Sequence, residues 1–128
     1  MNIIVREYLI NRARKPTNQT ISYQELSDTC KLGLNMGIEF DRKEIGKILG
    51  EISRFEYSQN KERPLISALV VTEGGGFKGG DGFYKLAEEL GLGKWRDIKK
   101  EGILYDIHIT KSIAFWKDDK NYIEHKNI

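Results

Sequence analysis

The sequence has little cysteine or histidine and no long apolar run, and these shortages exclude several classes of protein. Its single cysteine, Cys30, has no partner in the chain, so an internal disulfide is excluded and a reducing cytoplasm is the expected location. No apolar stretch approaches the ~18 residues that a membrane-spanning helix needs. The N-terminal segment carries charges within its apolar part and lacks a small-residue cleavage site, so we expect no signal peptide.

Groups suited to catalysis are equally scarce. The chain contains two histidines, His108 and His125, and no pair of carboxylates, metal-ligand cluster or catalytic triad at an indicative spacing. His108 lies in an apolar segment and is expected to be a packed side chain rather than a ligand. Cys30 is expected to be a small core residue. We therefore predict a protein that is not an enzyme and that uses no metal or other cofactor.

The composition indicates one folded domain. The 128 residues are 39% apolar and 31% charged, which predicts a single domain over residues 1–128 with a frayed tail at 119–128. The formal net charge is +2, from 21 basic and 19 acidic side chains, and it neither requires nor excludes an anionic partner. The positive excess lies at the two ends of the chain.

The first half of the chain is predicted to be helical. The spacing of residues 2–15 favours an amphipathic helix that ends before Pro16. We expect Arg6 to point away from its apolar face, which contains Ile3, Ile4, Tyr8, Leu9 and Ala13. Ser22 and Glu25 have the spacing of a capping box, which opens a helix from Tyr23 to about Leu32.

A third helix is predicted over Arg42–Ser58, with Asp41 as its N-cap. Its expected buried residues are Ile45, Ile48, Leu49, Ile52 and Phe55. Its outer face carries a basic stripe beside two glycines four residues apart, which are Gly46 and Gly50.

The segment Pro64–Gly91 is the one around which we expect the rest of the chain to pack. The apolar run Leu65–Val71 is typical of a strand buried on both faces. Six glycines follow between Gly74 and Gly82, and a short helix then ends at Gly91. A second short helix, roughly Gly93–Lys100, precedes a longer element. The β-branched residues within Ile107–Thr110 would also suit a strand, but we favour a helix ending near Asp118, whose expected inner residues are Ile103, Ile107, Ala114 and Trp116.

This order of elements predicts an α+β, mostly helical fold. Three helices, a strand and a glycine-rich loop are typical of a winged helix-turn-helix with a small β-hairpin, here followed by C-terminal helices. Arg42–Ser58 would be the recognition helix and Glu73–Asp81 the wing.

Two sets of stretches resemble known families. Ile21–Leu26 and Arg42–Gly50 resemble the DNA-binding domain of DNA alkyltransferases and alkyltransferase-like proteins. That family has a threonine-x-serine-tyrosine-glycine-glutamate-leucine segment before an arginine-alanine-valine-glycine helix. Pro64–Val71, followed by Gly80–Phe83, is similar to a module that accompanies some HNH-type restriction nucleases, and Ile113–Trp116 is similar to the closing aromatic segment of that module.

The resemblance implies a fold and a surface facing nucleic acid, without the chemistry of either family. The alkyltransferase nucleophile is a cysteine in a proline-cysteine-histidine-arginine motif, and Leu65–Ala68 at that position contains neither cysteine nor histidine. An HNH nuclease needs histidines with an asparagine near them, and the two histidines here do not supply that set.

Basic side chains are the candidate contacts to DNA phosphates. The predicted set is Arg12, Arg14, Lys15, Arg42, Lys43, Lys47, Arg54 and Lys78, and the wing loop would contribute Gly74, Gly75, Gly76, Phe77, Gly79 and Gly80. Each feature has an alternative interpretation. The stripe on the third helix is also typical of a solvated face paired by glutamates, the Arg12–Lys15 cluster suits a helix C-terminus, and the glycine loop is either a phosphate cradle or an ordinary hairpin tip.

The function predicted from these features is non-enzymatic binding of duplex DNA, mainly through its phosphate backbone. An alternative is a protein-interaction module, either a homodimer or an accessory or inhibitor in restriction or anti-phage systems. A third possibility is a small nucleotide-binding protein that uses the glycine-rich loop, although that loop lacks the lysine-hydroxyl ending of a nucleotide P-loop.

Overall fold

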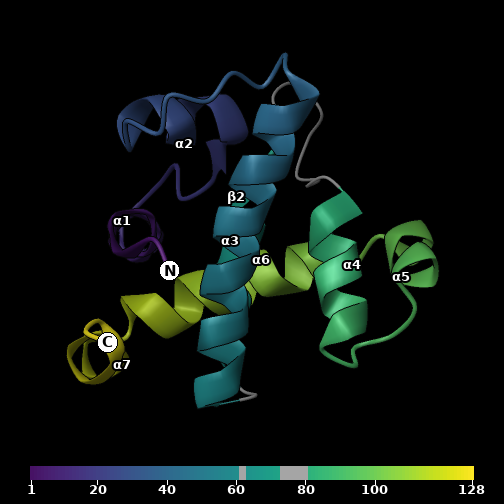
Figure 1. Ribbon diagram of the computed structural model, residues 1–128. Helices are drawn as coiled ribbons and strands as arrows, with labels where there is room; N and C mark the ends of the chain where they lie inside the picture. The colour runs from purple at the N-terminus through teal and green to yellow at the C-terminus, as the bar shows by residue number, and fades with distance from the viewer. Residues whose placement is uncertain (61–62, 73–80) are drawn as a thin grey trace.

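The computed structural model describes residues 1–60, 63–72 and 81–128, and it shows a mostly helical chain with one small sheet (Figure 1). The α-helices in these residues are α1 (Ile3–Ala13), α2 (Tyr23–Thr29), α3 (Glu39–Gln59), α4 (Asp81–Glu89), α5 (Trp95–Glu101), α6 (Leu104–Lys117) and α7 (Asp119–His125). The sheet is a parallel pair, β1 (Ile21–Ser22) with β2 (Val70–Val71). The predicted α+β, mostly helical class is confirmed.

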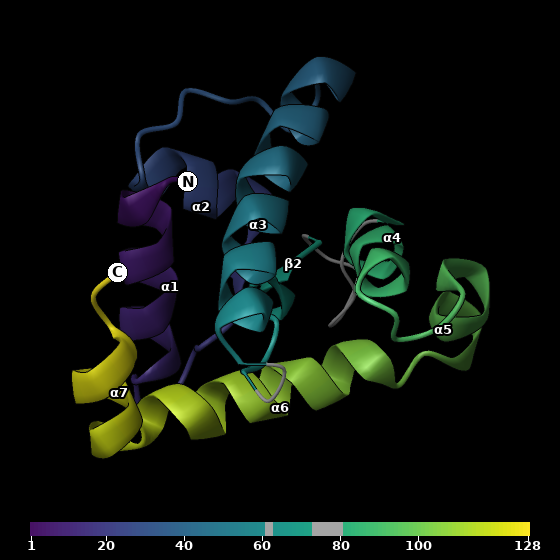
Figure 2. The same ribbon diagram turned by 60° about the horizontal axis from the view of Figure 1, so that its bottom comes forward.

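The long helix α3 stands at the centre of the molecule. Figure 1 shows α1 and α2 on one side of α3, and α4 and then α5 on the other. Figure 2 shows α6 running beneath these helices, with α7 turning back beside α1 at its far end. The two ends of the chain therefore lie on the same side of the molecule, near α1.

The apolar run Leu65–Val71 forms the middle of the core, but the prediction of a strand over its whole length is wrong. Ile66–Leu69 is a 3-10 helix, η1, and only Val70–Val71 is a strand. The physical reason is that β1 offers a partner only two residues long. The remaining buried backbone groups need other partners, and η1 supplies some of them locally, as when the Ala68 amide donates to the Leu65 carbonyl at 3.0 Å.

Polar side chains of α6 satisfy further backbone groups of this run. The Leu65 amide donates to Nδ1 of His108 at 3.0 Å, and the Tyr105 hydroxyl donates to the Val70 carbonyl. The face of α6 that is buried consists of Tyr105, His108, Ser112 and Trp116. The end of α6 near Asp118 is as predicted, and so is the packed role of His108. The predicted inner face is wrong, because Ile103 and Ile107 are exposed and Ala114 is too.

The predicted face of α1 is confirmed at Leu9 and Ala13 and wrong at Ile3, Ile4 and Arg6. Ile3 and Ile4 are exposed, whereas Arg6 is buried together with Val5, Leu9, Ile10 and Ala13. Arg6 turns inward because Glu56 of α3 is buried opposite it, with its Oε1 atom 2.8 Å from Nε of Arg6. A buried guanidinium needs such a partner, and the pair determines which side of α1 faces the core.

Local signals at helix ends are partly confirmed. The Ser22 hydroxyl accepts from the Glu25 amide at 3.2 Å, as an N-cap does. Gly91, with φ +83°, ends α4 as predicted, and the Leu92 amide donates back to the Ala87 carbonyl at 2.9 Å. Asp41 is not an N-cap, because α3 already begins at Glu39 and the Asp41 carboxylate accepts from the Asn35 amide instead.

The tail predicted to be frayed is the helix α7. Asp118 caps it by accepting from the Asn121 amide at 3.0 Å, and contacts from Arg6 hold its C-terminal end. The winged helix-turn-helix stays a prediction. In the part of the chain that the structure describes, β2 pairs in parallel with β1 and not in a hairpin. The predicted wing falls mostly on residues 73–80, outside the described residues.

Candidate nucleic-acid interface

A cleft of about 750 Å³ lies between α3 and α4. Residues of α3 spaced by three, four and seven positions form one wall, and residues of α4 form the other. The described residues of these walls include Glu39, Arg42, Lys43, Gly46 and Gly50 from α3, and Asp81, Phe83, Lys85 and Leu86 from α4. Figure 2 shows the N-terminal turns of α3 standing clear of α4.

Three cations gather on the exposed N-terminal half of α3. Arg42 and Lys43 line the cleft, and Lys47, one helical turn beyond Lys43, is exposed beside it. Arg42 donates one hydrogen bond to the Met36 carbonyl at 2.8 Å. Nζ of Lys43 lies 3.6 Å from the Glu39 carboxylate, and because both side chains are about three-quarters exposed this pair contributes little. All three cations can therefore reach an external anion.

Acidic residues of α3 lie beside the cationic row, because Glu44 and Glu51 are three and four positions from Lys47. Glu44 and Glu51 are seven residues apart, so they share one side of the helix, and neither lines the cleft. Glu51 faces the N-terminal amino group, whose nitrogen is 3.8 Å from its carboxylate. The cleft side of α3 therefore carries Arg42, Lys43 and one acid, Glu39, while Lys47 lies next to Glu44 and Glu51 on the neighbouring flank.

Two glycines leave the cleft wall of α3 bare. A Cβ atom at Gly46 would meet no heavy atom of the described protein within 4 Å, whereas one at Gly50 would lie 3.2 Å from a guanidinium nitrogen of Arg54. Neither glycine has a positive φ. Gly46 is therefore not required by the packing of α3.

Arg54 is paired with an acidic side chain of the same protein. It forms a two-point ion pair with Glu89 of α4, at 2.5 and 3.2 Å. The hydrogen bonds raise the pKa of Arg54 and lower that of Glu89. Both side chains are about half exposed. The pair joins α3 to α4, so Arg54 does not stand free beside Lys43 and Lys47 as the sequence analysis expected.

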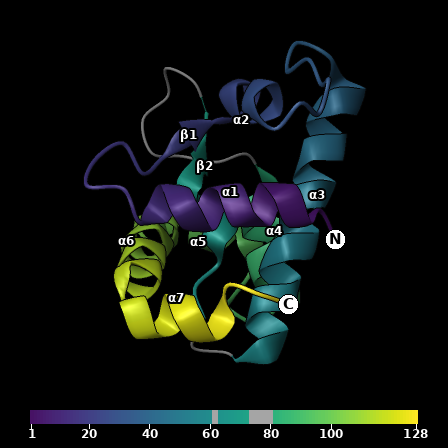
Figure 3. The same ribbon diagram turned by 90° about the vertical axis from the view of Figure 1, so that its left-hand side faces the viewer.

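The N-terminal cations serve the fold and do not join the α3 row. The Arg12 guanidinium donates to the Thr20 carbonyl at 2.9 and 3.1 Å. Arg14 donates to the Trp116 carbonyl at 2.8 Å and pairs with Asp119 at 2.7 Å. Lys15 is exposed just beyond the end of α1 that lies toward α6, away from α3 (Figure 3). Lys78 and the glycines of the predicted wing at 74–76, 79 and 80, with Phe77, are outside the described residues.

Lys85 was missed by the sequence analysis. It lies on the exposed side of α4 and lines the cleft opposite Arg42 and Lys43. Two glutamates, Glu88 and Glu89, follow it in the same helix, so the local sequence shows no basic stripe. The available signal was its place between the buried pairs Phe83–Tyr84 and Leu86–Ala87, which fixes it on the polar side of α4.

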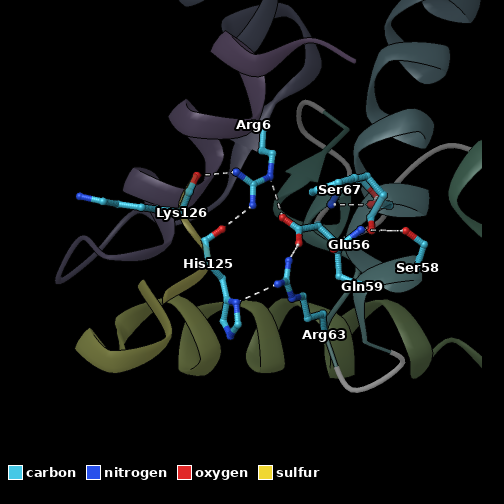
Figure 4. Close-up of polar contacts among 10 residues, drawn as sticks. Arg6, Glu56, Ser58, Gln59, Arg63, Ser67, His125 and Lys126 are labelled. Carbon is cyan, nitrogen blue, oxygen red and sulfur yellow. Dashed lines mark hydrogen bonds and ion pairs between the residues drawn. The ribbon is translucent and has the colours of Figure 1, made fainter. Parts of the chain in front are cut away.

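A second polar cluster joins the two ends of the chain, and its members are Arg6, Glu56, Arg63 and His125 (Figure 4). The Glu56 carboxylate is 1% exposed and accepts from Arg6 at 2.8 Å and from Arg63 at 2.6 Å. Arg6 also donates to the backbone carbonyls of His125 and Lys126, at 2.8 and 2.6 Å. Arg63 lies 2.8 Å from Nδ1 of His125. These groups partner one another, which indicates a structural role.

Other types of site find little support in the part of the chain that is described. Residues 1–60, 63–72 and 81–128 contain no group of three or more histidine, cysteine or acidic side chains arranged to hold a metal ion. None of the helices described there is both long and apolar enough to cross a bilayer. Comparison with known proteins gives no match to a family model, a curated protein or a solved structure. The alkyltransferase and nuclease resemblances therefore stay predictions.

Proposed function

We propose that this protein binds duplex DNA without catalysing a reaction, and that it holds the DNA against the cleft side of α3. The observation that carries the proposal is the row of Arg42, Lys43 and Lys47 on the exposed half of that helix, with Lys85 across the cleft. Phosphate contacts from such cations supply most of the non-specific affinity for DNA.

The arrangement of charge favours a polyanion over a neutral ligand. Arg42 and Lys43 both line the cleft, and Lys47 follows one turn beyond Lys43. Glu44 and Glu51 lie next to Lys47, and Glu51 already faces the N-terminal amino group at 3.8 Å. The acids nearest to the row are weak competitors. Glu39 is about three-quarters exposed in its pair with Lys43, and exchanging such a pair for a phosphate contact costs less than about 1 kcal/mol.

The bare wall at Gly46 supports close approach of a backbone. Gly46 lies one turn from Arg42 and Lys43 and has open space where a side chain would be. A sugar-phosphate chain held by these cations could therefore contact the helix surface itself. The α3 helix would then act mainly through the backbone of the DNA, with little direct reading of bases.

A titration of labelled duplex DNA by fluorescence anisotropy tests the proposal. We expect binding at about 50 mM salt that weakens steeply as salt rises. Lys43→Glu plus Lys47→Glu should weaken binding to all duplex sequences to a similar degree. Lys117→Glu plus Lys120→Glu makes the same charge change on α6 and α7 and should have a much smaller effect. Absence of binding by the wild type at about 50 mM salt would reject the function.

A protein-interaction module is the second candidate, and one observation favours it. Ile38 and Phe40 are 50% and 68% exposed at the start of α3, close to the cationic row. Exposed apolar side chains beside a charged rim are typical of partner surfaces. Sedimentation velocity distinguishes the candidates, because a dimer that Phe40→Ser converts to monomers would favour this function over DNA binding.

A further inference from the structure

The basic surface at the cleft continues from α4 onto α5 through two side-chain contacts. Nζ of Lys85, on the cleft wall, lies 5.1 Å from the centre of the Trp95 ring. Asp81, on the same wall, pairs with Lys99 of α5 at 2.6 Å. The two contacts bring both ends of α5, at Trp95 and at Lys99, to the rim of the cleft. Figure 1 shows the corresponding order, with α3, α4 and α5 side by side.

Trp95 is flanked by two cations. Besides Lys85, the Arg96 guanidinium carbon lies 5.2 Å from the centre of the Trp95 ring. The indole packs against the smaller of two core clusters but stays partly exposed. A partly exposed indole beside two cations combines the two features that bind a polynucleotide, namely a stacking surface and phosphate contacts.

The charges of α5 are sorted by face. Arg96 and Lys100 are four residues apart and lie on one side of the helix. Asp97 and Glu101 are also four residues apart and lie on the adjacent side. Lys94, at the N-cap, and Arg96 and Lys100 are all exposed. Lys85 itself lies between Asp81 and Glu89, one turn away on either side in α4, and these two acids are paired with Lys99 and Arg54.

We propose that DNA held at α3 extends across α4 onto α5, where Lys85 and Arg96 contact phosphates and the Trp95 ring packs against a sugar or base. This inference rests on the proposed function and adds a second contact region to it. The sequence analysis gave no role to Lys85 or Arg96. Their proximity depends on α4 and α5 packing side by side, which local spacing does not reveal.

Intrinsic fluorescence offers a direct test, because the protein has two tryptophans and Trp116 is only 1% exposed. We expect duplex DNA to quench the emission of the wild type, and Trp95→Phe to abolish that change. We also expect Lys85→Gln plus Arg96→Gln to reduce the slope of log affinity against log salt by about 2, which is about one unit per lost phosphate contact. Both substituted side chains are exposed, and circular dichroism and thermal melting would verify that the variants fold.

A matched pair of substitutions controls for net charge. Lys117→Gln plus Lys120→Gln removes the same charge at the far end of α6 and on α7 (Figure 2), and it should leave the salt slope unchanged. One set of results would overturn the inference alone. DNA would bind, and Lys43→Glu plus Lys47→Glu would weaken binding. Lys85→Gln plus Arg96→Gln would nevertheless show the same salt slope as the Lys117 and Lys120 control, and the emission of Trp95 would stay constant. In that case the proposed function still stands. Failure of the wild type to bind duplex DNA would overturn both.

Discussion

Gly46→Ala is expected to stabilise the protein and at the same time to weaken its binding to DNA. Gly46 lies inside α3, and the site of an added Cβ has no heavy atom of the described residues within 4 Å. Glycine in a helix interior is less favourable than alanine by about 1 kcal/mol. The free energy of unfolding should therefore rise by about 0.5–1 kcal/mol, which corresponds to about 2–4 °C in Tm for a domain of this size.

The expected loss of affinity has a separate cause. The new methyl group would stand on the cleft wall beside Lys43, where the proposal places the sugar-phosphate backbone. If it costs about 1.4 kcal/mol of contact energy, the affinity falls about tenfold. A change that stabilises the fold yet harms binding would identify Gly46 as a contact position.

Gly50→Ala is the matched control for stability. Its Cβ would lie 3.2 Å from the Arg54 guanidinium, so Arg54 must shift and its pair with Glu89 is disturbed. The gain in stability should therefore be smaller than at Gly46. Urea unfolding measures the first effect and anisotropy of labelled duplex the second. If Gly46→Ala binds DNA as tightly as the wild type, the DNA backbone does not approach closely at Gly46. If Gly46→Ala is less stable than the wild type, the added methyl group does not stand in open space.

Two further predictions concern the core. Glu56→Gln should lower the free energy of unfolding by about 3–5 kcal/mol in urea denaturation, because it leaves the buried Arg6 guanidinium without its anion. Glu89→Gln, at the half-exposed pair with Arg54, should lower the free energy of unfolding by less than about 1 kcal/mol. Equal losses of stability in Glu56→Gln and Glu89→Gln would contradict the distinction between a buried and an exposed ion pair. Burial, and then nearby Lys111, lower the pKa of His108 from 6.5 to about 4. Because the folded pKa is lowered, stability is complete above about pH 6.5 and falls as the pH drops toward 4, where the unfolded chain binds a proton that the folded imidazole does not. His108→Gln should remove up to about 3 kcal/mol of this loss of stability at pH 4. The measurement is the free energy of unfolding in urea at each pH from about 7 to about 4. If that free energy falls with pH to the same extent in the wild type and in His108→Gln, another group is responsible.

The sequence predicted those elements whose determinants are local. The Ser22 cap, the end of α4 at Gly91 and the helical nature of residues 104–117 depend on residues within a few positions of one another. The exposed spacing of Lys43 and Lys47 on one side of α3 follows in the same way from helical periodicity. These features hold whatever else packs nearby.

The features that were predicted wrongly depend on partners far along the chain. Arg6 faces inward because of Glu56, fifty residues away, and Arg14 is engaged by the end of α6. The run Leu65–Val71 has the composition of a buried strand, but its partner strand is only two residues long. Its backbone forms hydrogen bonds with side chains of α6 instead. Local periodicity carries no information about such partners. The same limitation concealed the proximity of Lys85 to Trp95.

The contacts of Arg6 also bear on the order in which the chain can fold. Its guanidinium binds backbone carbonyls 119 and 120 residues further along. A growing chain on a ribosome would therefore carry this cation without its final partners until residue 126 has emerged. Docking of α1 against α3 should then finish as a late step, limited by closure of a very long loop.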